Sequence, residues 1–211
     1  NLVSSYIIMP EGPEVRWMID QVNKKIIRKN KPCRLLELEI ISGRYIKHGF
    51  PDNYKKFNKL LKEDKIYLED LNSKGKFIYM KTENSDWSIW LTLGMSGHLL
   101  IYPKDHLRFI FRTSNGNYYL DDMRNFGTIN FCPTVECLDT KLASIGPDFL
   151  NDSDKEFTPD NFVEIIRKIK QDKLIAVVLV DQKKMSSIGN YLRAEILYQA
   201  KINPFRKLKD L

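Results

Sequence analysis

The sequence predicts an α+β protein in which an N-terminal helix and an antiparallel β region precede a helical region. Three observations support this prediction. Apolar residues recur at helical spacing behind Pro13, short strand-like segments follow one another from about residue 34, and helical periodicity returns near residue 158. Because no long helices separate the strand-like segments, we expect an antiparallel sandwich or barrel and not a parallel sheet.

The N-terminal helix is predicted from a stripe of apolar residues at helical spacing. The stripe consists of Val15, Met18, Ile19, Val22 and Ile26. Pro13 suits the first turn of a helix, where its missing N–H group needs no partner. The helix is therefore expected to begin directly behind Pro10 and Glu11.

The β region is predicted from short segments rich in β-branched and aromatic residues. In chain order these segments are KIYLED, KFIYMKT, WSIWLTL, HLLIY, LRFIFRT and YYLDD. Ahead of them Leu36, Leu38 and Ile40 alternate with glutamates, which predicts that these three side chains share one face of a strand. Asn115-Gly116, between two of the segments, indicates a hairpin turn.

The C-terminal helical region begins at Thr158-Pro159, a pair typical of a helix start. Its first apolar stripe consists of Phe162, Ile165, Ile166 and Ile169. A boundary is expected between about residues 140 and 157, where Gly146-Pro147 and a polar stretch interrupt the pattern. We therefore predict a β-sandwich domain over residues 9–145 and a helical domain over residues 158–211.

The composition narrows the functional class. Lysine and arginine number 34 against 27 aspartates and glutamates, which gives a net charge of +7 and a pI near 9.2. This balance favours a polyanionic partner such as nucleic acid, although a basic surface without such a partner explains the charge equally well. No apolar run has the length of a membrane span, and residues 1–8 lack the features of a signal peptide. We therefore expect a soluble, intracellular monomer that has no membrane partner.

The cysteines predict no covalent framework. Cys33, Cys132 and Cys137 are odd in number and show no paired-ligand spacing, so neither a disulfide framework nor a zinc site is expected.

One candidate binding element precedes the last helix. Residues 187–190 lead straight into this helix, so backbone N–H groups and the Asn190 amide lie at the positive end of its dipole, where a phosphate can bind. The alternative is an ordinary well-capped helix. Lys76, which follows Gly75 at the start of a strand, is either a second phosphate contact or a solvated lysine.

A second candidate element is the segment with Arg124 and Phe126, just beyond a predicted strand. Phe126 can wedge between bases while Arg124 pairs with the base left behind. Alternatively, Phe126 caps the β core and Arg124 forms a surface salt bridge. Met95, flanked by small residues at an expected hairpin tip, either fills a vacated base position or fills the core.

Residues 9–15, MPEGPEV, have the form of a chain start. Removal of Met9 would leave Pro10 with a free amine, a nucleophile that titrates at roughly pH 7.7 to 8.0 in generic chains. An interior proline nitrogen is instead a tertiary amide and offers no lone pair.

The chain resembles the formamidopyrimidine-DNA glycosylase and endonuclease VIII family. Over residues 9–206 it carries that family's landmark sequences in matching order and roughly matching spacing: MPEGPEV, GKFIYM, LGMSG, DMRNFG, IGPDFL and SSIGNYLRAEILYQAKINP. MPEGP favours the endonuclease VIII branch, and LGMSG favours a viral or eukaryote-like member of it. The resemblance implies a two-layered β-sandwich with an N-terminal helix, followed by a helix-two-turns-helix domain, with damaged DNA bound between them.

The resemblance also implies an activity. Members are bifunctional DNA glycosylases and abasic-site lyases of base excision repair, and this branch removes oxidised pyrimidines through a Schiff base followed by β,δ-elimination. The matching positions assign Pro10 as the nucleophile and Glu11 as the catalytic acid. The other matches are Lys76 on the phosphate beside the lesion, Glu14 near the site, Asn190 on the DNA backbone, and Met95, Arg124 and Phe126 as the residues that fill the void left by a flipped base. Duplex, bubble and single-stranded DNA are all candidate substrates.

Three features depart from the family pattern. Pro10 is internal, and an acylated nitrogen cannot form an iminium ion, so the chain with residues 1–9 retained is expected to lack both activities. Residues 1–8 are then either an addition ahead of an internal start or native, in which case the chain is a catalytically silent module that binds bent or damaged DNA. Asn125 stands where the family often has a second arginine, which bears on the preferred opposite base. The family's C-terminal zinc finger, or its zincless equivalent, does not occur before Leu211, so we expect no cofactor in this chain and a missing C-terminal element.

Overall fold

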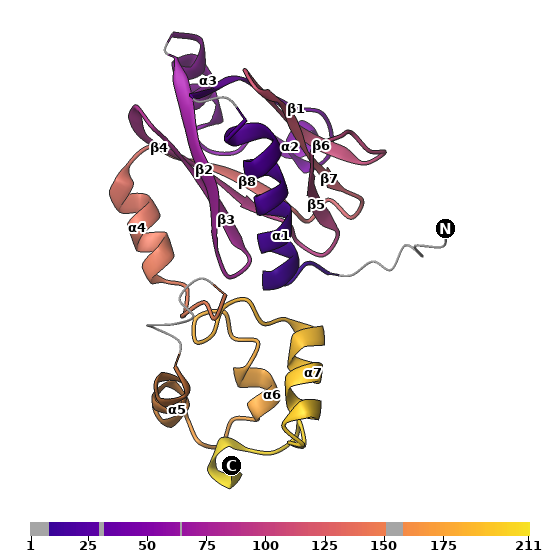
Figure 1. Cartoon of the computed structure of the whole chain (residues 1–211), viewed down its shortest axis with the longest axis vertical. Helices are drawn as coiled ribbons and strands as arrows, with labels where there is room; N and C mark the ends of the chain where they lie inside the picture. The colour runs from indigo at the N-terminus through magenta and orange to yellow at the C-terminus, as the bar shows by residue number, and fades with distance from the viewer. Residues whose placement is uncertain (1–8, 30–31, 64, 151–157) are drawn as a thin grey trace. The chain divides into compact units, whose positions relative to one another are not determined.

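The computed structural model describes residues 9–29, 32–63, 65–150 and 158–211 (Figure 1). By its internal contacts the chain divides into two compact units. The sheet unit comprises residues 14–73 and 77–139 together with the described residues up to Pro10, and the helical unit comprises residues 11–13, 74–76 and 140–211. Among the described residues, no helix combines the length and the apolar character that crossing a bilayer requires.

The sheet unit contains eight strands in one antiparallel sheet. The strands are β1 (Cys33–Ile40), β2 (Ile66–Lys74), β3 (Phe77–Thr82), β4 (Ser85–Thr92), β5 (Gly97–Leu100), β6 (Leu107–Thr113), β7 (Gly116–Asp122) and β8 (Thr128–Cys132). Their order in the sheet is β5-β7-β6-β1-β2-β3-β4-β8. The predicted hairpin turn joins β6 to β7, where Thr113 pairs with Gly116. The predicted α+β class with an antiparallel sheet is confirmed.

The sheet folds over on itself to form two facing layers. The Tyr118 hydroxyl on β7 donates to Met80 Sδ on β3 at 3.1 Å, although three strands separate β7 from β3 in the sheet order. In a flat sheet these strands would lie about 19 Å apart, at about 4.8 Å per step. Both side chains are fully buried, and burial raises the pKa of Tyr118 well above its ordinary value. The core therefore lies between the two halves of the sheet.

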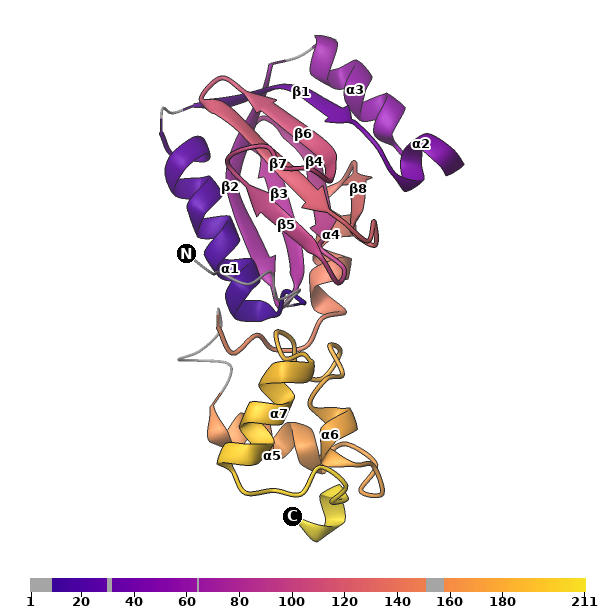
Figure 2. The same cartoon turned by 90° about the vertical axis from the view of Figure 1, so that its right-hand side faces the viewer.

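The N-terminal helix α1 (Gly12–Val22) continues into a π-helical turn, η1 (Asn23–Ile27), and packs on the sheet (Figure 2). Its predicted apolar stripe is buried. β1 and β2 pair only between residues 33–35 and 66–68, so the backbone of Leu71 has no β1 partner. The Asn23 side chain takes that place: its amide donates to the Leu71 carbonyl and its oxygen accepts from the Leu71 N–H, both at 2.8 Å.

Replacement of this asparagine tests its role as a substitute for a strand partner. Asn23→Ala is expected to lower the free energy of unfolding by about 2–4 kcal/mol, because it leaves two buried backbone groups without partners. Urea denaturation measures the change. Asn72→Ala serves as the control, since Asn72 is exposed and its amide donates to the nearby Asp70 carbonyl at 2.9 Å. Equal effects of the two substitutions would contradict this role.

Two helices between β1 and β2 are absent from the sequence prediction. They are α2 (Arg44–His48) and α3 (Tyr54–Glu63). Phe57 of α3 is fully buried and packs against Trp87 and Phe131, with ring centroids 5.5 and 5.1 Å apart. The lysine-rich sequence of α3 hides its short apolar stripe, and the helix is stabilised by aromatic residues that lie far away in the chain.

The predicted face of the first strand is wrong at Leu36. Its side chain is 50% exposed, whereas Leu35 and Leu38 are buried. The pairing of β1 with β6 shifts register between Leu35 and Glu37, which marks a β-bulge. A bulge adds one residue to the strand, so the strict alternation assumed from the sequence fails there.

Cys132 and Cys137 form a disulfide, contrary to the sequence prediction. The end of β8 and the first turn of α4 (Val135–Ala143) bring their Cα atoms to 6.4 Å, within the normal range for a disulfide. A spacing of five residues does not reveal this proximity, because it depends on the strand-to-helix turn. Cys33 is a buried thiol, and burial raises its pKa above the ordinary value.

The helical unit contains α5 (Pro159–Arg167), α6 (Ile175–Val178), α7 (Asn190–Gln199) and a final 3-10 turn, η2 (Leu208–Asp210). Thr158 caps α5 as predicted, since its hydroxyl accepts from the Asn161 N–H at 3.2 Å. The unit has a core of its own, formed by Ile169, Ile175, Val178, Leu179, Met185, Ile188, Leu197 and Leu208.

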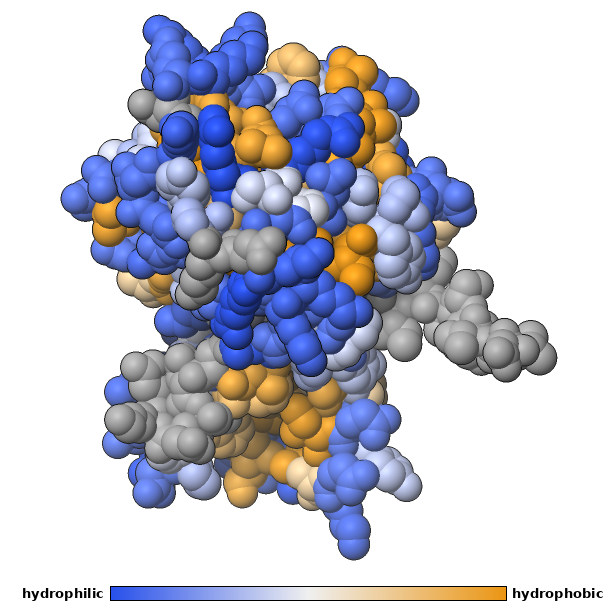
Figure 3. Space-filling model, turned by 45° about the horizontal axis from the view of Figure 1, so that its top comes forward, coloured by the Kyte–Doolittle hydropathy of each residue, from blue (hydrophilic) through white to orange (hydrophobic). Residues whose placement is uncertain are grey.

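Much of the face of the sheet unit seen in Figure 3 is hydrophilic.

Candidate active site

The Glu11 carboxylate lies at the N-terminus of α7, within the helical unit. Its Oε2 accepts the N–H groups of Gly189 and Leu192 at 2.7 and 3.2 Å, and its Oε1 accepts the N–H of Tyr191 at 3.0 Å. The side chain is 1% exposed. First-turn N–H groups have no partner inside a helix, and the helix dipole favours negative charge there. Glu11 therefore caps α7 from a position 178 residues earlier in the chain.

Two glycines allow this close approach. A Cβ atom at Gly189 would lie 2.2 Å from Glu11 Oε1, and one at Gly12 would lie 2.4 Å from Ser187 Cβ. The Gly12 N–H also donates to the Ser187 carbonyl at 2.9 Å. The segment that follows Pro10 thus runs directly against the turn that precedes α7.

Lys76 lies in the turn before β3, and its Nζ donates to the Ile188 carbonyl at 3.1 Å. Burial lowers the pKa of Lys76 below its ordinary value, whereas the negative charge of Glu11 acts in the opposite direction. Since an ammonium group has three donors, two remain for other partners such as phosphate oxygens. Lys76 and Glu11 therefore hold adjacent residues of one turn, Ile188 and Gly189.

Asp148 is a buried residue of this site that sequence reasoning missed. Its Oδ2 accepts the Gly75 N–H at 2.7 Å, and its Oδ1 accepts the Leu150 N–H at 3.0 Å and the Ser187 hydroxyl. The carboxylate ties the turn that carries Lys76 to the turn before α7. Asp148 belongs to the IGPDFL motif, but an aspartate after Gly-Pro is typical of any loop, so its partners could not be predicted.

The predicted phosphate site at the start of α7 requires a correction. The Gly189, Tyr191 and Leu192 N–H groups already donate to Glu11, so they are not available to a phosphate. The sequence showed the helix start but not the distant carboxylate that occupies it. The Asn190 side chain is exposed at the first position of α7.

Pro10 and Glu14 flank the start of α1. Pro10 is buried directly before the helix, and Glu14 is half-buried in its first turn. Within the described part of the chain, no group of three or more His, Cys, Asp or Glu side chains is arranged to hold a metal ion.

Met95, Arg124 and Phe126 lie close together in the sheet unit, and we call them the wedge cluster. The Arg124 guanidinium lies 3.6 Å from Met95 Sδ. Met95 and Phe126 are 39% and 51% exposed, so Met95 does not fill the core, which was its alternative role. The segment with Arg124 and Phe126 follows β7, as predicted.

The expected hairpin at Met95 is wrong. The loop around Met95 joins β4 to β5, and these strands lie near opposite ends of the sheet order. The small residues that suggested a hairpin tip instead form a tight turn, in which Gly94 has a φ of 60° and the Gly97 N–H donates to the Leu93 carbonyl at 2.9 Å.

Asn125 adopts an unusual backbone conformation in the segment after β7. Its φ angle is 56°, a left-handed conformation that asparagine tolerates better than most residues. Its carbonyl accepts the Arg44 guanidinium at 2.9 Å, and a Cβ at Gly43 would lie 2.4 Å from its side-chain oxygen. Asn125 is therefore part of the turn that presents Arg124 and Phe126.

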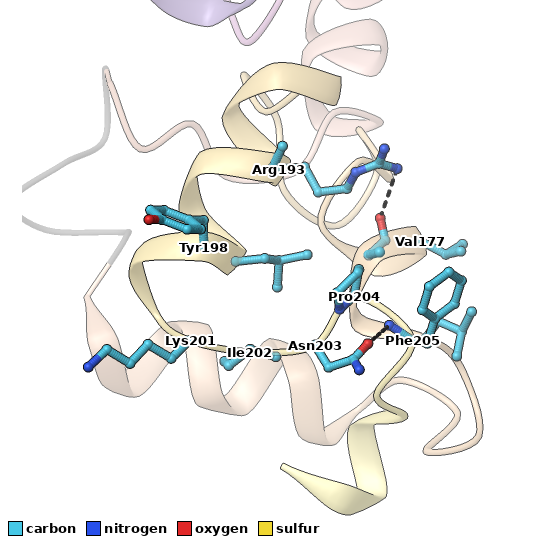
Figure 4. A pocket seen from close by; sticks show the side chains of 12 residues that line it. Val177, Arg193, Tyr198, Lys201, Ile202, Asn203, Pro204 and Phe205 are labelled. Carbon is cyan, nitrogen blue, oxygen red and sulfur yellow. Dashed lines mark hydrogen bonds between the residues drawn. The ribbon is translucent and has the colours of Figure 1, made fainter.

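The helical unit also carries an apolar groove of about 800 Å³ (Figure 4). Its walls come from α6, α7 and the segment after α7, with Val177, Tyr198 and Phe205 all more than half exposed. Arg193 crosses one side and donates to the Ala176 carbonyl at 3.5 Å. The groove contains none of the candidate site residues.

Comparisons with known proteins agree with this architecture. Residues 9–129 match the family model of the formamidopyrimidine-DNA glycosylase N-terminal domain. The chain is 29% identical over 211 residues to the formamidopyrimidine-DNA glycosylase of Bacillus cereus, covering 96% of this chain and 71% of that protein. It is 30% identical over 203 residues to the enzyme of Carboxydothermus hydrogenoformans, covering 94% of this chain and 68% of that protein.

Solved structures show the same fold. Lactococcus lactis Fpg, in complex with DNA containing an oxidised pyrimidine, matches with a TM-score of 0.76 and 24% identity over 96% of this chain and 72% of that one. The same protein in an inhibited form, with DNA containing N7-benzyl-Fapy-dG, matches with a TM-score of 0.74 and 25% identity over the same shares. The fold is that of the DNA-repair glycosylase class.

This chain belongs to the formamidopyrimidine-DNA glycosylase family. The predicted family is thereby confirmed. The placement in its endonuclease VIII branch stays a prediction, since the relatives named above are formamidopyrimidine-DNA glycosylases.

Proposed function

We propose that this chain, with Pro10 as its first residue, is a bifunctional DNA glycosylase and abasic-site lyase that excises oxidised pyrimidines from damaged DNA. The Pro10 amine attacks C1′ of the damaged nucleotide and displaces the base. Opening of the sugar ring gives an iminium ion, which acidifies the neighbouring C2′–H bond. Loss of that proton expels the 3′ phosphate by β-elimination, and δ-elimination then releases the 5′ phosphate.

The observation that carries the proposal is the position of Glu11. The residue next to the nucleophile has its carboxylate fixed by three N–H groups and buried. In this proposal Glu11 protonates the sugar ring oxygen and shuttles protons in later steps. Lys76 contacts the phosphate beside the lesion through the donors that the Ile188 carbonyl leaves available, and Asn190 and Glu14 assist at the DNA backbone and near the site.

The wedge cluster supports a base-flipping mechanism. A duplex hides C1′ and the damaged base, so the nucleotide must leave the stack at a cost of a few kcal/mol. Exposed Met95 and Phe126, with Arg124 beside Met95, are suited to fill the vacated space and to offset lost stacking.

The lesion class and the compartment follow from the same proposal. The relative from Lactococcus lactis was solved with DNA containing an oxidised pyrimidine and with DNA containing N7-benzyl-Fapy-dG, so the pyrimidine preference rests on the MPEGP motif of this chain. The protein acts wherever DNA is kept, and the net charge of +7 fits that partner.

Strand cleavage by the chain that begins at Pro10 tests this function. We expect cleavage of duplexes that contain an oxidised pyrimidine, weaker cleavage of duplexes that contain a formamidopyrimidine, and no cleavage of undamaged duplex. Both new ends should carry phosphates. Log affinity should fall with log salt by roughly 0.9 per phosphate neutralised. Binding without any cleavage would leave only a DNA-binding module, and a flat salt response would exclude a DNA partner.

A further inference from the structure

Asp122 is a fully buried carboxylate that joins the two loops of the wedge cluster. It ends β7 and is 0% exposed. Its Oδ1 accepts the Ser96 hydroxyl at 2.5 Å, and its Oδ2 accepts the Gly127 N–H at 2.7 Å. Ser96 follows Met95 in one loop, and Gly127 follows Phe126 in the other. One side chain therefore bonds both loops directly beside their exposed residues.

Ser96 extends this connection to Arg124. Its Oγ donates to Asp122 and at the same time accepts the Arg124 N–H at 2.9 Å. A serine hydroxyl has one donor and two acceptor sites, so it can link an acceptor to a donor in this way. Asp122 and Ser96 therefore reach all three residues of the wedge cluster. Ser96 is the neighbour of Met95 and bonds the Arg124 N–H, and Asp122 bonds the N–H of Gly127, the neighbour of Phe126.

Other contacts hold Asp122 in place. The Arg108 Nε–H donates to the Asp122 carbonyl at 2.8 Å, and the Asn125 N–H donates to the same carbonyl at 3.2 Å. Gly94 has a φ of 60°, and a Cβ there would lie 2.7 Å from Phe126 Cβ, so the loops touch closely. These contacts hold the two loops together in the free protein.

We propose that Asp122 and Ser96 are positioning residues that hold the wedge cluster ready to enter DNA. The inference rests on the proposed function, because it assigns a role in opening the duplex. A preformed cluster avoids the cost of ordering two loops during base extrusion. A carboxylate suits the position because Ser96 and Gly127 both donate to it. With asparagine at this position, an NH₂ group would face one of these two donors, and that hydrogen bond would be lost because both groups donate.

The test compares double-stranded with single-stranded substrate, each with one abasic site. In single-stranded DNA no partner base is left behind and no void needs filling, so the chemical step does not require the wedge cluster. Asp122→Asn and Ser96→Ala are expected to slow cleavage of the duplex by about 10- to 100-fold, the scale of a misplaced positioning group. Cleavage of the single strand should change by less than about threefold, on the same reasoning.

Asp121→Asn is the matched control. It makes the same chemical change one residue earlier, at a carboxylate that accepts the His106 N–H at 2.7 Å in a different loop. We expect Asp121→Asn to leave the cleavage rates of both substrates unchanged. The fluorescence of 2-aminopurine placed opposite the abasic site reports unstacking of that base. This fluorescence should be lower in complexes with Asp122→Asn or Ser96→Ala than in the complex with the parent chain, and unchanged with the control.

The outcomes separate the two proposals. Equal loss on duplex and single strand, or no loss on duplex, would overturn the role of Asp122 and Ser96. If Asp122→Asn does not fold by circular dichroism, Ser96→Ala decides the question, because it retains the bond between Asp122 and Gly127. If the parent chain that begins at Pro10 cleaves neither substrate, it is the proposed function that fails.

Discussion

A chain that begins at Pro10 is expected to become covalently attached to DNA containing an abasic site when the mixture is reduced with borohydride. The reductant traps the iminium ion formed by the free secondary amine. The chain that retains residues 1–9 is expected to yield no adduct at Pro10, because its proline nitrogen is an amide. Pro10→Gly should lower lesion cleavage by about 10³-fold or more, on the scale seen when an enzyme loses its nucleophile.

Peptide mapping of the adduct makes this prediction specific. Lys76 is the competing nucleophile, since burial lowers its pKa and increases the fraction of neutral amine. Lys76→Arg, which keeps the charge, is the control and should retain the adduct at Pro10. An adduct that maps to Lys76, or that survives in the chain with residues 1–9, would contradict the assigned role of Pro10.

Gly189→Ala is expected to reduce lesion cleavage by about 100-fold or more, because displacement of a catalytic group by about 1 Å has that effect. The new Cβ would lie 2.2 Å from Glu11 Oε1, so the carboxylate must leave the N–H groups of α7. The backbone at Gly189 has a φ of −123°, which any residue adopts, so the effect is steric and not conformational. Single-turnover cleavage measures it.

Gly49→Ala is the control for this substitution. Gly49 has a φ of 97°, and a Cβ there meets nothing within 4 Å. Alanine at residue 49 should therefore lower the free energy of unfolding by about 1 kcal/mol through backbone strain and leave cleavage unchanged. If Gly189→Ala retains full activity, the carboxylate position does not matter for the reaction.

The order of elements was predictable because it depends on local patterns. The apolar stripe behind Pro13, the strand-like segments and the Thr158 cap all lie where the structure has a helix, strands and a helix start. Helices stabilised from a distance escaped prediction. Phe57 is the clearest case, since the aromatic rings that bury it belong to β4 and to β8.

The candidate site residues that lie in sequence motifs could be named in advance, whereas the residues that support them could not. Motif order pointed to Pro10, Glu11 and Lys76, and it also pointed to the wedge cluster. It did not point to Asp148 or Asp122, whose importance lies in their partners. Both are aspartates next to turns, and a buried aspartate looks the same in sequence as a solvated one.

By itself, the sequence determined the α+β class and the family and supplied the candidate site residues, because periodicity and short motifs are properties of neighbouring residues. Only the tertiary structure decided that the sheet folds over, that Glu11 and not a phosphate caps α7, and that Asp122 joins two loops. Hydrogen bonds between residues up to 181 positions apart depend on where the folded chain brings donors and acceptors together, and no local pattern specifies that.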